Sequence, residues 1–242
     1  MKLFERIGEF FKRFLFNSSW RCVVCGKEIF DQTHFCKECL NSLPVIAGAT
    51  CNHCGRTLKA STQFCTTCKG RLIFLDKCRS VYDYKKPVSV LIKNFKYYNA
   101  RYLCDLFAEG LVNLYLKNYL NVDGVVYVPM SSKAEKKRGY NQSKLLAQEF
   151  CKRTGIMLLD CLEKNKETVR QATLSKEARI KNLKKAFRVT DKKLVEGKSV
   201  VIIDDVSTTG STGEALAECL KRAKATNVYL LTVASVAPKH GY

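Results

Sequence analysis

Residues 201–216 read VIIDDVSTTGSTGEAL, and the expected fold of most of the chain follows from this stretch. Its apolar start predicts a buried strand that ends in Asp204 and Asp205. The small residues after the strand let successive backbone N–H groups converge on a phosphate where a helix begins. Two carboxylates would repel that phosphate if they faced it, but they suit the paired hydroxyls of a sugar, or an Mg²⁺ ion held partly through water. The stretch therefore predicts a site for a phosphorylated ribose.

Strands and helices are expected to alternate on both sides of this stretch, over residues 76–242. This alternation predicts an α/β fold in which a mostly parallel sheet is covered by helices on both faces. Ligands of such sheets bind outside the carboxyl ends of the strands. A loop is expected over residues 131–142, with Asn141 or Ser143 as the cap of the next helix. The expected strands are residues 124–130, 156–162, 198–206 and 227–236, and the expected helices are residues 103–114, 143–151 and 214–222.

A four-cysteine pattern occurs twice near the N-terminus, and the second copy follows the first at an offset of 29 residues. Each copy has the spacing C-x2-C-x10-C-x2-C, with a glycine directly after the first pair. A C-x2-C turn brings two thiolates to one cation, so two such turns complete a closed tetrahedral zinc site. The cysteines are Cys22, Cys25, Cys36 and Cys39 in the first copy, and Cys51, Cys54, Cys65 and Cys68 in the second.

The pattern predicts a double zinc ribbon over residues 20–75 with two structural Zn²⁺ sites. The tandem repeat favours one site in each copy, and a cross-braced pairing of the cysteines is the alternative. Redox-active C-x-x-C pairs are expected beside a thioredoxin-like βαβ pattern, which the sequence lacks; an iron–sulfur cluster is a further alternative. Because this segment has few apolar residues, zinc is expected to supply its folding free energy.

Residues 1–19 precede the ribbon, and their apolar side chains between positions 3 and 16 have helical spacing. The apolar face of this amphipathic helix is expected to dock on the protein itself or on a partner, with peripheral membrane contact as the alternative. No apolar run is long enough for a transmembrane helix, and the N-terminus does not resemble a secretory signal. Cysteines in zinc motifs indicate a reducing compartment, so a cytoplasmic location is expected, with membrane association as the alternative.

The chain has 42 Lys and Arg residues against 22 Asp and Glu residues, which is a net charge of +20. Such an excess suggests a polyanionic partner, with a lysine-rich solvated surface as the alternative. Lys93 and Lys96 flank Phe95, and Tyr97 and Tyr98 follow. Basic residues interleaved with aromatic residues suit a single-stranded nucleic acid, although packing of the aromatic side chains explains the same pattern.

The segment VVIIDDVSTTGST, residues 200–212, resembles the 5-phosphoribosyl-1-pyrophosphate (PRPP) motif of type I phosphoribosyltransferases. The resemblance implies a phosphoribosyltransferase-like fold that takes PRPP together with Mg²⁺. It implies that Asp204 and Asp205 form the catalytic pair that binds the ribose hydroxyls. The residues implied to cradle the 5′-phosphate are Thr208, Thr209, Gly210, Ser211 and Thr212.

Three further segments are similar to those of the ComF family. They are NFKYYN (residues 94–99), VPMSSKAEKKRGYNQS (residues 128–143) and RQATLSKEARIKNLKKAF (residues 170–187). A zinc ribbon before a phosphoribosyltransferase-like domain is also how that family is built. The resemblance covers roughly residues 20–238.

The fold that the resemblance implies assigns roles to two loops. Residues 164–185 occupy the place of a mobile catalytic loop, and Arg170, Arg179 and Lys181 are candidates to contact phosphate or nucleic acid there. Surface solvation explains these residues equally well. The loop after the first core strand is implied to bind pyrophosphate, with a solvated basic loop as the alternative; its residues are Met130, Ser131, Ser132, Lys133 and Arg138.

Three functions are compatible with these features. The first is a ComF-type competence protein that binds single-stranded DNA, or a protein of the DNA-uptake machinery, in natural transformation. The second is an active phosphoribosyltransferase of nucleotide or base metabolism. The third is a regulator in which PRPP binding changes the affinity for nucleic acid. Resemblance to the family favours the first, although fold alone does not determine function.

Overall fold

The structure is a computed structural model that describes residues 21–30, 34–51, 53–58, 62–66, 68–69, 73–118, 120–164 and 186–236. The helix expected at residues 3–16 and the candidate residues Arg170, Arg179 and Lys181 lie outside these ranges. The chain divides into two compact units, Met1–Leu43 and Pro44–Tyr242. The second four-cysteine copy therefore belongs to the larger unit, while the ribbon boundary near residue 75 stays a prediction.

Both four-cysteine copies begin with the same backbone turn. In the smaller unit, the Gly26 amide donates to the Cys22 carbonyl at 2.8 Å, and the helix α2 (Lys37–Asn41) follows. In the larger unit, the Gly55 amide donates to the Cys51 carbonyl at 3.0 Å. Both glycines have a positive φ, 75° and 69°, a conformation that favours glycine in a tight turn.

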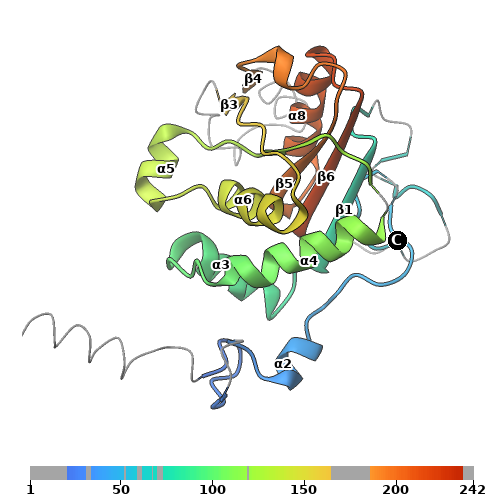
Figure 1. The fold of residues 1–242 in the computed structure, drawn as a ribbon. Coiled ribbons are helices and arrows are strands. Elements are labelled where there is room, and N and C mark those ends of the chain that lie inside the picture. Colours follow the sequence, from blue (N-terminus) through green and yellow to red (C-terminus); the bar gives the residue numbers. More distant parts are fainter. Residues whose placement is uncertain are drawn as a thin grey trace, which may run out of the picture. The chain divides into compact units, whose positions relative to one another are not determined.

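The larger unit is built on a four-stranded parallel sheet (Figure 1). Its strand order is β1-β6-β5-β2, so the central strands β6 and β5 are consecutive in the sheet and are linked by a helix. The register aligns Asp204 of β5 with Thr232 of β6, and Ile203 of β5 with Tyr127 of β2. The strands are β1 (Lys77–Asp83), β2 (Gly124–Tyr127), β5 (Ser199–Ser207) and β6 (Asn227–Ser235).

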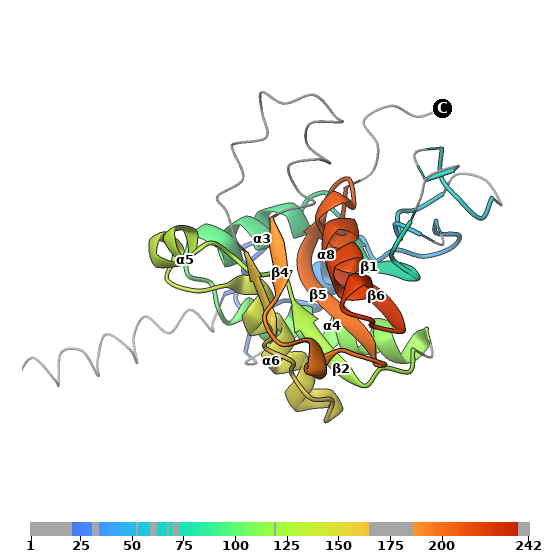
Figure 2. The ribbon, with the colours of Figure 1, turned by 90° about the horizontal axis from the view of Figure 1, so that it is seen from above.

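Helices cover both faces of this sheet, as the two views in Figures 1 and 2 show. On one face, α4 (Leu103–Lys117) and α6 (Gln142–Thr154) contact the strands and each other. On the other face, α8 (Ser211–Arg222) shares a core with alternate residues of β5 and β6, such as Ile202 and Leu230. The antiparallel pair β3 (Leu162–Lys164) and β4 (Phe187–Val189) also contributes to that core. The expected α/β fold is thus confirmed.

Several elements differ from the sequence prediction. The strand expected at residues 156–162 is not formed as such: Leu158 forms only a bridge to Val125, the Cys161 amide then turns back to the Leu159 carbonyl, and β3 begins at Leu162. The expected loop 131–142 contains α5 (Ser132–Arg138), and α8 begins three residues earlier than predicted. The helices α3 (Val88–Tyr97) and η3 (Lys192–Leu194) were not predicted.

Candidate functional site

The connection between β5 and α8 has the geometry of an anion site. β5 ends at Ser207, α8 begins at Ser211, and Gly210 precedes the helix with a φ of 75°. An added Cβ on Gly210 would meet nothing within 4 Å, so the left-handed backbone, rather than lack of space, favours glycine. Among the described residues, the amides of Thr212 and Gly213 donate to no backbone carbonyl. Such amides at the start of a helix are donors for an anion.

This connection lines a small hollow that is open to solvent. The first turn of α8 packs closely against β6. An added Cβ on Gly213 would lie only 2.5 Å from Leu230 Cδ2, so this contact favours glycine. On the loop itself, the Thr209 and Ser211 hydroxyls are hydrogen-bonded at 2.7 Å. The residues that line the hollow are Asp204, Val206, Ser207, Thr208, Gly210, Ser211, Thr212, Gly213 and Leu230.

The two aspartates point to opposite faces of the sheet, as successive strand residues do. Asp204 lines the hollow and is half-buried, and its Oδ1 accepts a hydrogen bond from Ser143 Oγ at 2.7 Å. Asp205 is only 3% exposed, and its Oδ1 lies 2.8 Å from Lys96 Nζ of α3. Within the described part of the chain, Asp205 Oδ2 has no hydrogen-bond partner. The Asp204 carboxylate therefore lines the hollow, and the Asp205 carboxylate lies on the opposite face of the sheet, where it pairs with Lys96.

The electrostatic state of the acidic pair follows from burial and from the charges around it. Burial and the adjacent Asp205 carboxylate raise the pKa of Asp204 to about 7, against the opposing effects of the Ser143 hydroxyl and Lys96. For Lys96, burial would lower the pKa, but the attraction of the Asp205 carboxylate outweighs burial and raises it. Lys96 is therefore held as a cation, while Asp204 is partly protonated near neutral pH.

The loop after β2 leaves the sheet beside the acidic pair. The Val128 amide donates to the Ile203 carbonyl at 3.3 Å, which extends the pairing past the end of β2. Asn141 Nδ2 donates to the Val128 carbonyl at 3.1 Å, and Asn141 Oδ1 caps α6 by accepting from the Ser143 amide. The prediction of Asn141 as a cap is thus confirmed. This cap positions the Ser143 hydroxyl against Asp204.

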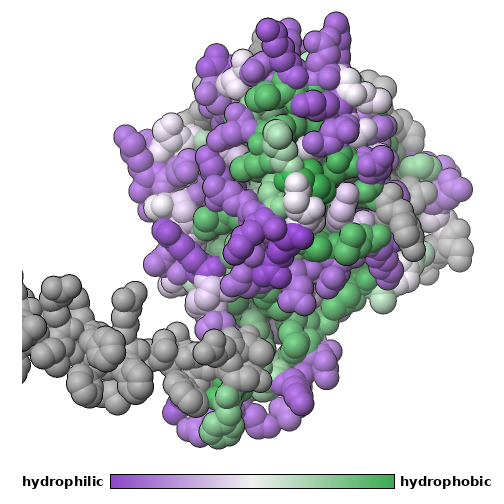
Figure 3. Space-filling view, viewed as in Figure 1, coloured by the Kyte–Doolittle hydropathy of each residue, from purple (hydrophilic) through white to green (hydrophobic). Residues whose placement is uncertain are grey.

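The residues predicted to bind pyrophosphate lie on and around α5, a region that is hydrophilic in Figure 3. Ser131 is the N-cap of α5, since its Oγ accepts from the Ala134 amide at 3.3 Å. Ser132 and Lys133 are exposed in the first turn. Arg138, at the other end of the helix, donates to Gln142 Oε1 at 2.5 Å. A pyrophosphate role for these residues and for Met130 stays a prediction.

Two groups of four cysteines have the geometry of metal centres. In each group the four sulfur atoms lie within 4.8 Å of one another, with one group in each copy of the repeat. Tetrahedral zinc with Zn–S bonds of about 2.3 Å places its sulfur ligands about 3.8 Å apart. Cys25 Sγ lies 3.8 Å from Cys36 Sγ, and Cys54 Sγ lies 3.7 Å from Cys65 Sγ. The sequential pairing is thus the one observed, and both groups fit zinc.

One thiol in each group has the acidity of a metal ligand. A hydrogen bond from the Cys68 thiol is the main reason that the pKa of Cys54 is lowered to about 4. For Cys22, burial would raise the pKa, but backbone amides, of which Cys36 is the first, lower it to about 6. Another thiol in each group behaves in the opposite way: a hydrogen bond with Cys54 raises the pKa of Cys68, and burial raises the pKa of Cys39. Since zinc binds the thiolate, metal binding must displace the protons that these thiols keep.

Comparison with known proteins extends these observations to the whole chain. Residues 12–69 match the double zinc ribbon domain, and residues 136–241 match the phosphoribosyl transferase domain. The DNA utilization protein YhgH of Salmonella typhi is 32% identical over 217 residues, which cover 86% of each chain. Competence protein F of Haemophilus influenzae is 30% identical over 216 residues, which cover 84% of this chain and 92% of that protein.

The chain belongs to the ComF family. Among solved structures, the glutamine PRPP amidotransferase of B. subtilis is 23% identical to this ComF protein, with a TM-score of 0.40 over 55% of this chain and 26% of that one. No helix in the described part of the protein is long and apolar enough to span a membrane.

Three contacts at the site of this ComF protein were not predicted from its sequence. They are Ser143 with Asp204, Lys96 with Asp205, and a contact from Arg56 to Thr208 in the phosphate loop (residues 208–212). Ser143 ends the RGYNQS segment and Lys96 is the lysine of NFKYYN, so both lie in family-like segments that could have indicated a site role. Lys96 was assigned to nucleic acid, but its ammonium group is paired with Asp205.

Proposed function

We propose that this ComF protein binds PRPP at the junction of β5 and α8 and acts in DNA uptake during natural transformation, with single-stranded DNA as its partner. The hollow at that junction supports the proposal, because it combines helix amides that have no backbone partner within the described ranges with one half-buried carboxylate. The amides at the positive end of α8 suit the 5′-phosphate. The carboxylate of Asp204 suits the ribose hydroxyls that the same ligand carries.

The acidic pair divides its roles in this proposal. Asp204 accepts from the ribose hydroxyls, and Asp205 pairs with Lys96 on the opposite face of the sheet. Among the described residues, only the carboxylate of Asp204 lines the hollow, so these residues offer few of the oxygen ligands that a resident Mg²⁺ ion needs. Asp204 would therefore share any Mg²⁺ with the pyrophosphate group of the ligand, whose charge the ion would neutralise. The basic residues of α5 and the loop before it, including Lys133 and Arg138, are the candidates to contact that pyrophosphate.

Calorimetric titration with PRPP and Mg²⁺ tests the pocket. We expect the wild-type protein to bind and Asp204→Ala to bind too weakly to detect. Asp160→Ala is the matched control, because Asp160 is an exposed carboxylate that pairs with Lys144 and does not line the hollow. If the wild-type protein fails to bind PRPP, the proposed site is wrong.

Catalysis by the same pocket is the second candidate, and the complete strand, loop and helix of the phosphate site favour it. In a transferase of nucleotide or base metabolism, an acceptor base forms a bond to C1 of the PRPP ribose while the C1–O bond to pyrophosphate breaks, and pyrophosphate is released. A PRPP-sensing regulator uses the pocket without turnover. Pyrophosphate release across a panel of bases separates the two, and release that Asp204→Ala abolishes would establish the enzyme.

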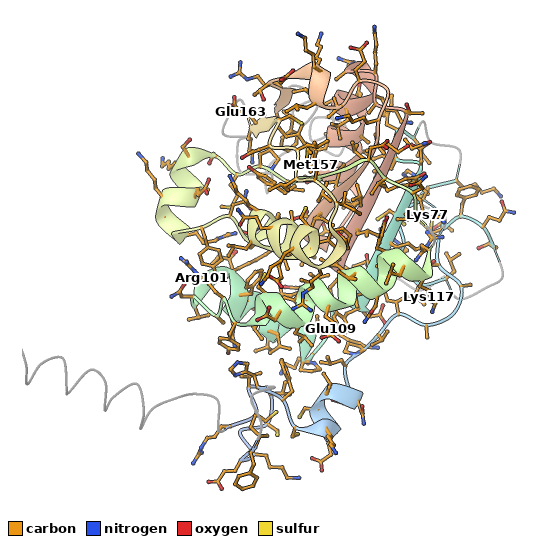
Figure 4. All side chains as sticks on the ribbon, in the orientation of Figure 1. Lys77, Arg101, Glu109, Lys117, Met157 and Glu163 are labelled. Atoms are coloured by element: carbon orange, nitrogen blue, oxygen red, sulfur yellow. The ribbon has the colours of Figure 1, made fainter. Side chains whose placement is uncertain are left out.

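A surface beside α3 is the candidate contact for single-stranded DNA. Tyr97 and Tyr98 are 67% and 76% exposed, and the guanidinium of Arg138 lies 5.1 Å from the centre of the Tyr97 ring. Lys93 is exposed on α3. Arg101, which is labelled in Figure 4, lies just before the start of α4. Exposed rings bordered by cations suit bases that stack and phosphates that pair. The net charge of +20 supports the same partner.

Fluorescence anisotropy with a labelled oligothymidine over a salt series tests this surface. We expect Tyr97→Ala/Tyr98→Ala to weaken binding about tenfold or more, since each stacked base contributes about 1–3 kcal/mol. Met157→Ala is the control, because Met157 is also 66% exposed and lies apart from Arg101 in Figure 4. Wild-type affinity that does not change with salt would exclude a phosphate-contact interface.

The zinc thiolates suit a reducing compartment, so we place this activity in the cytoplasm.

A further inference from the structure

A buried arginine of the second four-cysteine copy contacts the phosphate loop. Arg56 directly follows the turn that holds Cys51 and Cys54, and it is only 8% exposed. Its Nη2 donates to the Thr208 carbonyl at 3.4 Å, and its Nε has no hydrogen-bond partner among the described residues. Arginine is rarely buried without full pairing. Its position beside an anion loop therefore indicates a functional reason for burial.

The same cysteine turn also contacts the far side of the loop. His53, which is 7% exposed, has its Nε2 2.5 Å from Oε1 of Glu214 in the first turn of α8. The other carboxylate oxygen of Glu214 accepts from the Phe74 amide at 2.9 Å. Arg56 thus contacts the first residue of the phosphate loop, Thr208, and His53 contacts Glu214, two residues after the loop in the first turn of α8.

Main-chain packing fixes this turn against the sheet. An added Cβ on Gly55 would lie 2.6 Å from the Cys78 carbonyl oxygen and 2.8 Å from Arg79 Cα, both in β1. Arg79 Nη1 also donates to the Cys51 carbonyl at 3.3 Å. A turn with backbone contacts this close cannot shift without moving its side chains. The conformation of the cysteine turn therefore determines where the side chains of His53 and Arg56 lie.

The first copy of the repeat lacks both loop-contacting residues. At the offset of 29 residues, His53 corresponds to Val24 and Arg56 corresponds to Lys27. The Lys27 side chain is 64% exposed and pairs with Glu38 at 2.9 Å in the smaller unit. The two copies thus keep the same cysteine spacing and differ at the positions that, in the second copy, contact the phosphate loop.

We propose that the second four-cysteine site positions the phosphate loop for PRPP, with Arg56 and His53 as the positioning residues. This inference rests on the proposed PRPP site. In a trans peptide the C=O and N–H groups point in opposite directions. By donating to the Thr208 carbonyl, Arg56 directs the Thr209 amide to the opposite side of the loop. The guanidinium of Arg56 also places a positive charge beside the loop. Zinc binding shapes the turn that carries both residues.

The test compares Arg56→Met with Lys27→Met, the equivalent change in the first copy. Two readouts are measured on the full chain with its zinc content verified: PRPP affinity by calorimetry, and hydrogen exchange of the amides of residues 208–214 without ligand. We expect Arg56→Met to bind PRPP about tenfold more weakly, as loss of a hydrogen bond from a charged group predicts. We also expect faster exchange in this loop, and Arg56→Lys to restore part of both. Lys27→Met should match the wild type.

Each outcome decides the inference. If Arg56→Met keeps two zinc ions and behaves as Lys27→Met in both readouts, the inference is wrong. If Arg56→Met loses a zinc ion, His53→Val, which restores the residue of the first copy, decides by the same two readouts. If the wild-type protein does not bind PRPP, the proposed function fails, while hydrogen exchange of the loop still shows whether Arg56 positions it.

Discussion

The replacement of Asp204 by asparagine should stabilise the fold while it removes PRPP binding. In the folded protein, burial and the carboxylate of Asp205 raise the pKa of Asp204 to about 7. In the unfolded chain an aspartate has a pKa of about 3.9, so the folded state binds more protons between these two values. The free energy of unfolding therefore falls as the pH rises from about 4 to about 7. Asparagine keeps the shape of the side chain and removes this ionisation.

The size of the effect follows from the pKa difference. A difference of about 3 pH units corresponds to about 4 kcal/mol at 1.36 kcal/mol per unit. Asp204 is half-buried at the hollow, so solvent screening reduces this figure and we expect about 2 kcal/mol. Asp204→Asn should thus exceed the wild type in stability by about 2 kcal/mol at pH 8. At pH 4, where Asp204 is protonated, the two proteins should be nearly equal.

Urea unfolding monitored by circular dichroism between pH 4 and pH 8 measures this difference. Asp160→Asn is the control of opposite sign: burial would raise the pKa of Asp160, but hydrogen bonds from Tyr127 and Lys144 outweigh burial and lower it. Its replacement should leave the protein no more stable at pH 8 than the wild type. An Asp204→Asn protein whose stability advantage is absent at pH 8, or is equally large at pH 4, would refute the assignment of the buried charge.

Four further substitutions test the site and the metal centres. Lys96→Met leaves the buried Asp205 carboxylate without its cation and should lower the free energy of unfolding by about 3 kcal/mol in urea at pH 8; an unchanged midpoint would contradict the ion pair. Gly210→Ala forces a side chain into a left-handed backbone and should cost about 1–2 kcal/mol in the same assay, with a loss below 0.3 kcal/mol as the contradicting result. Cys68→Ser should release one of two zinc ions and lower the calorimetric transition of the larger unit, whereas Cys39→Ser should release the other and leave that transition in place.

The fold was predictable from sequence where the pattern was local. The apolar run before Asp204 reads as a buried strand, and the cysteine spacing brings four thiols together, because both depend on residues close in the chain. The α5 helix was missed, although the sequence carries its start and end signals: Ser131 caps it, and Gly139 ends it with a φ of 87°. The run of charged residues between them has no apolar face, so helical periodicity was absent.

The partners of the acidic pair were not predictable from local pattern. Lys96 and Asp205 are 109 positions apart, and Arg56 and Thr208 are 152 positions apart, so only the folded chain brings them together. Alternation along a strand does imply that two successive aspartates face opposite sides of the sheet. That rule could have separated the two carboxylates from sequence alone. Instead, the sequence resemblance assigned both to the ribose.

Three features meet at one junction, and together they support the ribose phosphate that we propose as its ligand. Asp204 has a raised pKa, Asp205 has a buried oxygen with no partner in the described residues, and Gly210 holds a left-handed turn before unpaired amides. A ribose with vicinal hydroxyls and a 5′-phosphate supplies donors to the carboxylate and an anion to the amides. Deoxyribose in a DNA strand lacks the 2′-hydroxyl, and its phosphate is shared between two sugars. On this proposal the hollow suits a ribose phosphate better than DNA, and single-stranded DNA would bind a separate surface such as the exposed Tyr97 and Tyr98.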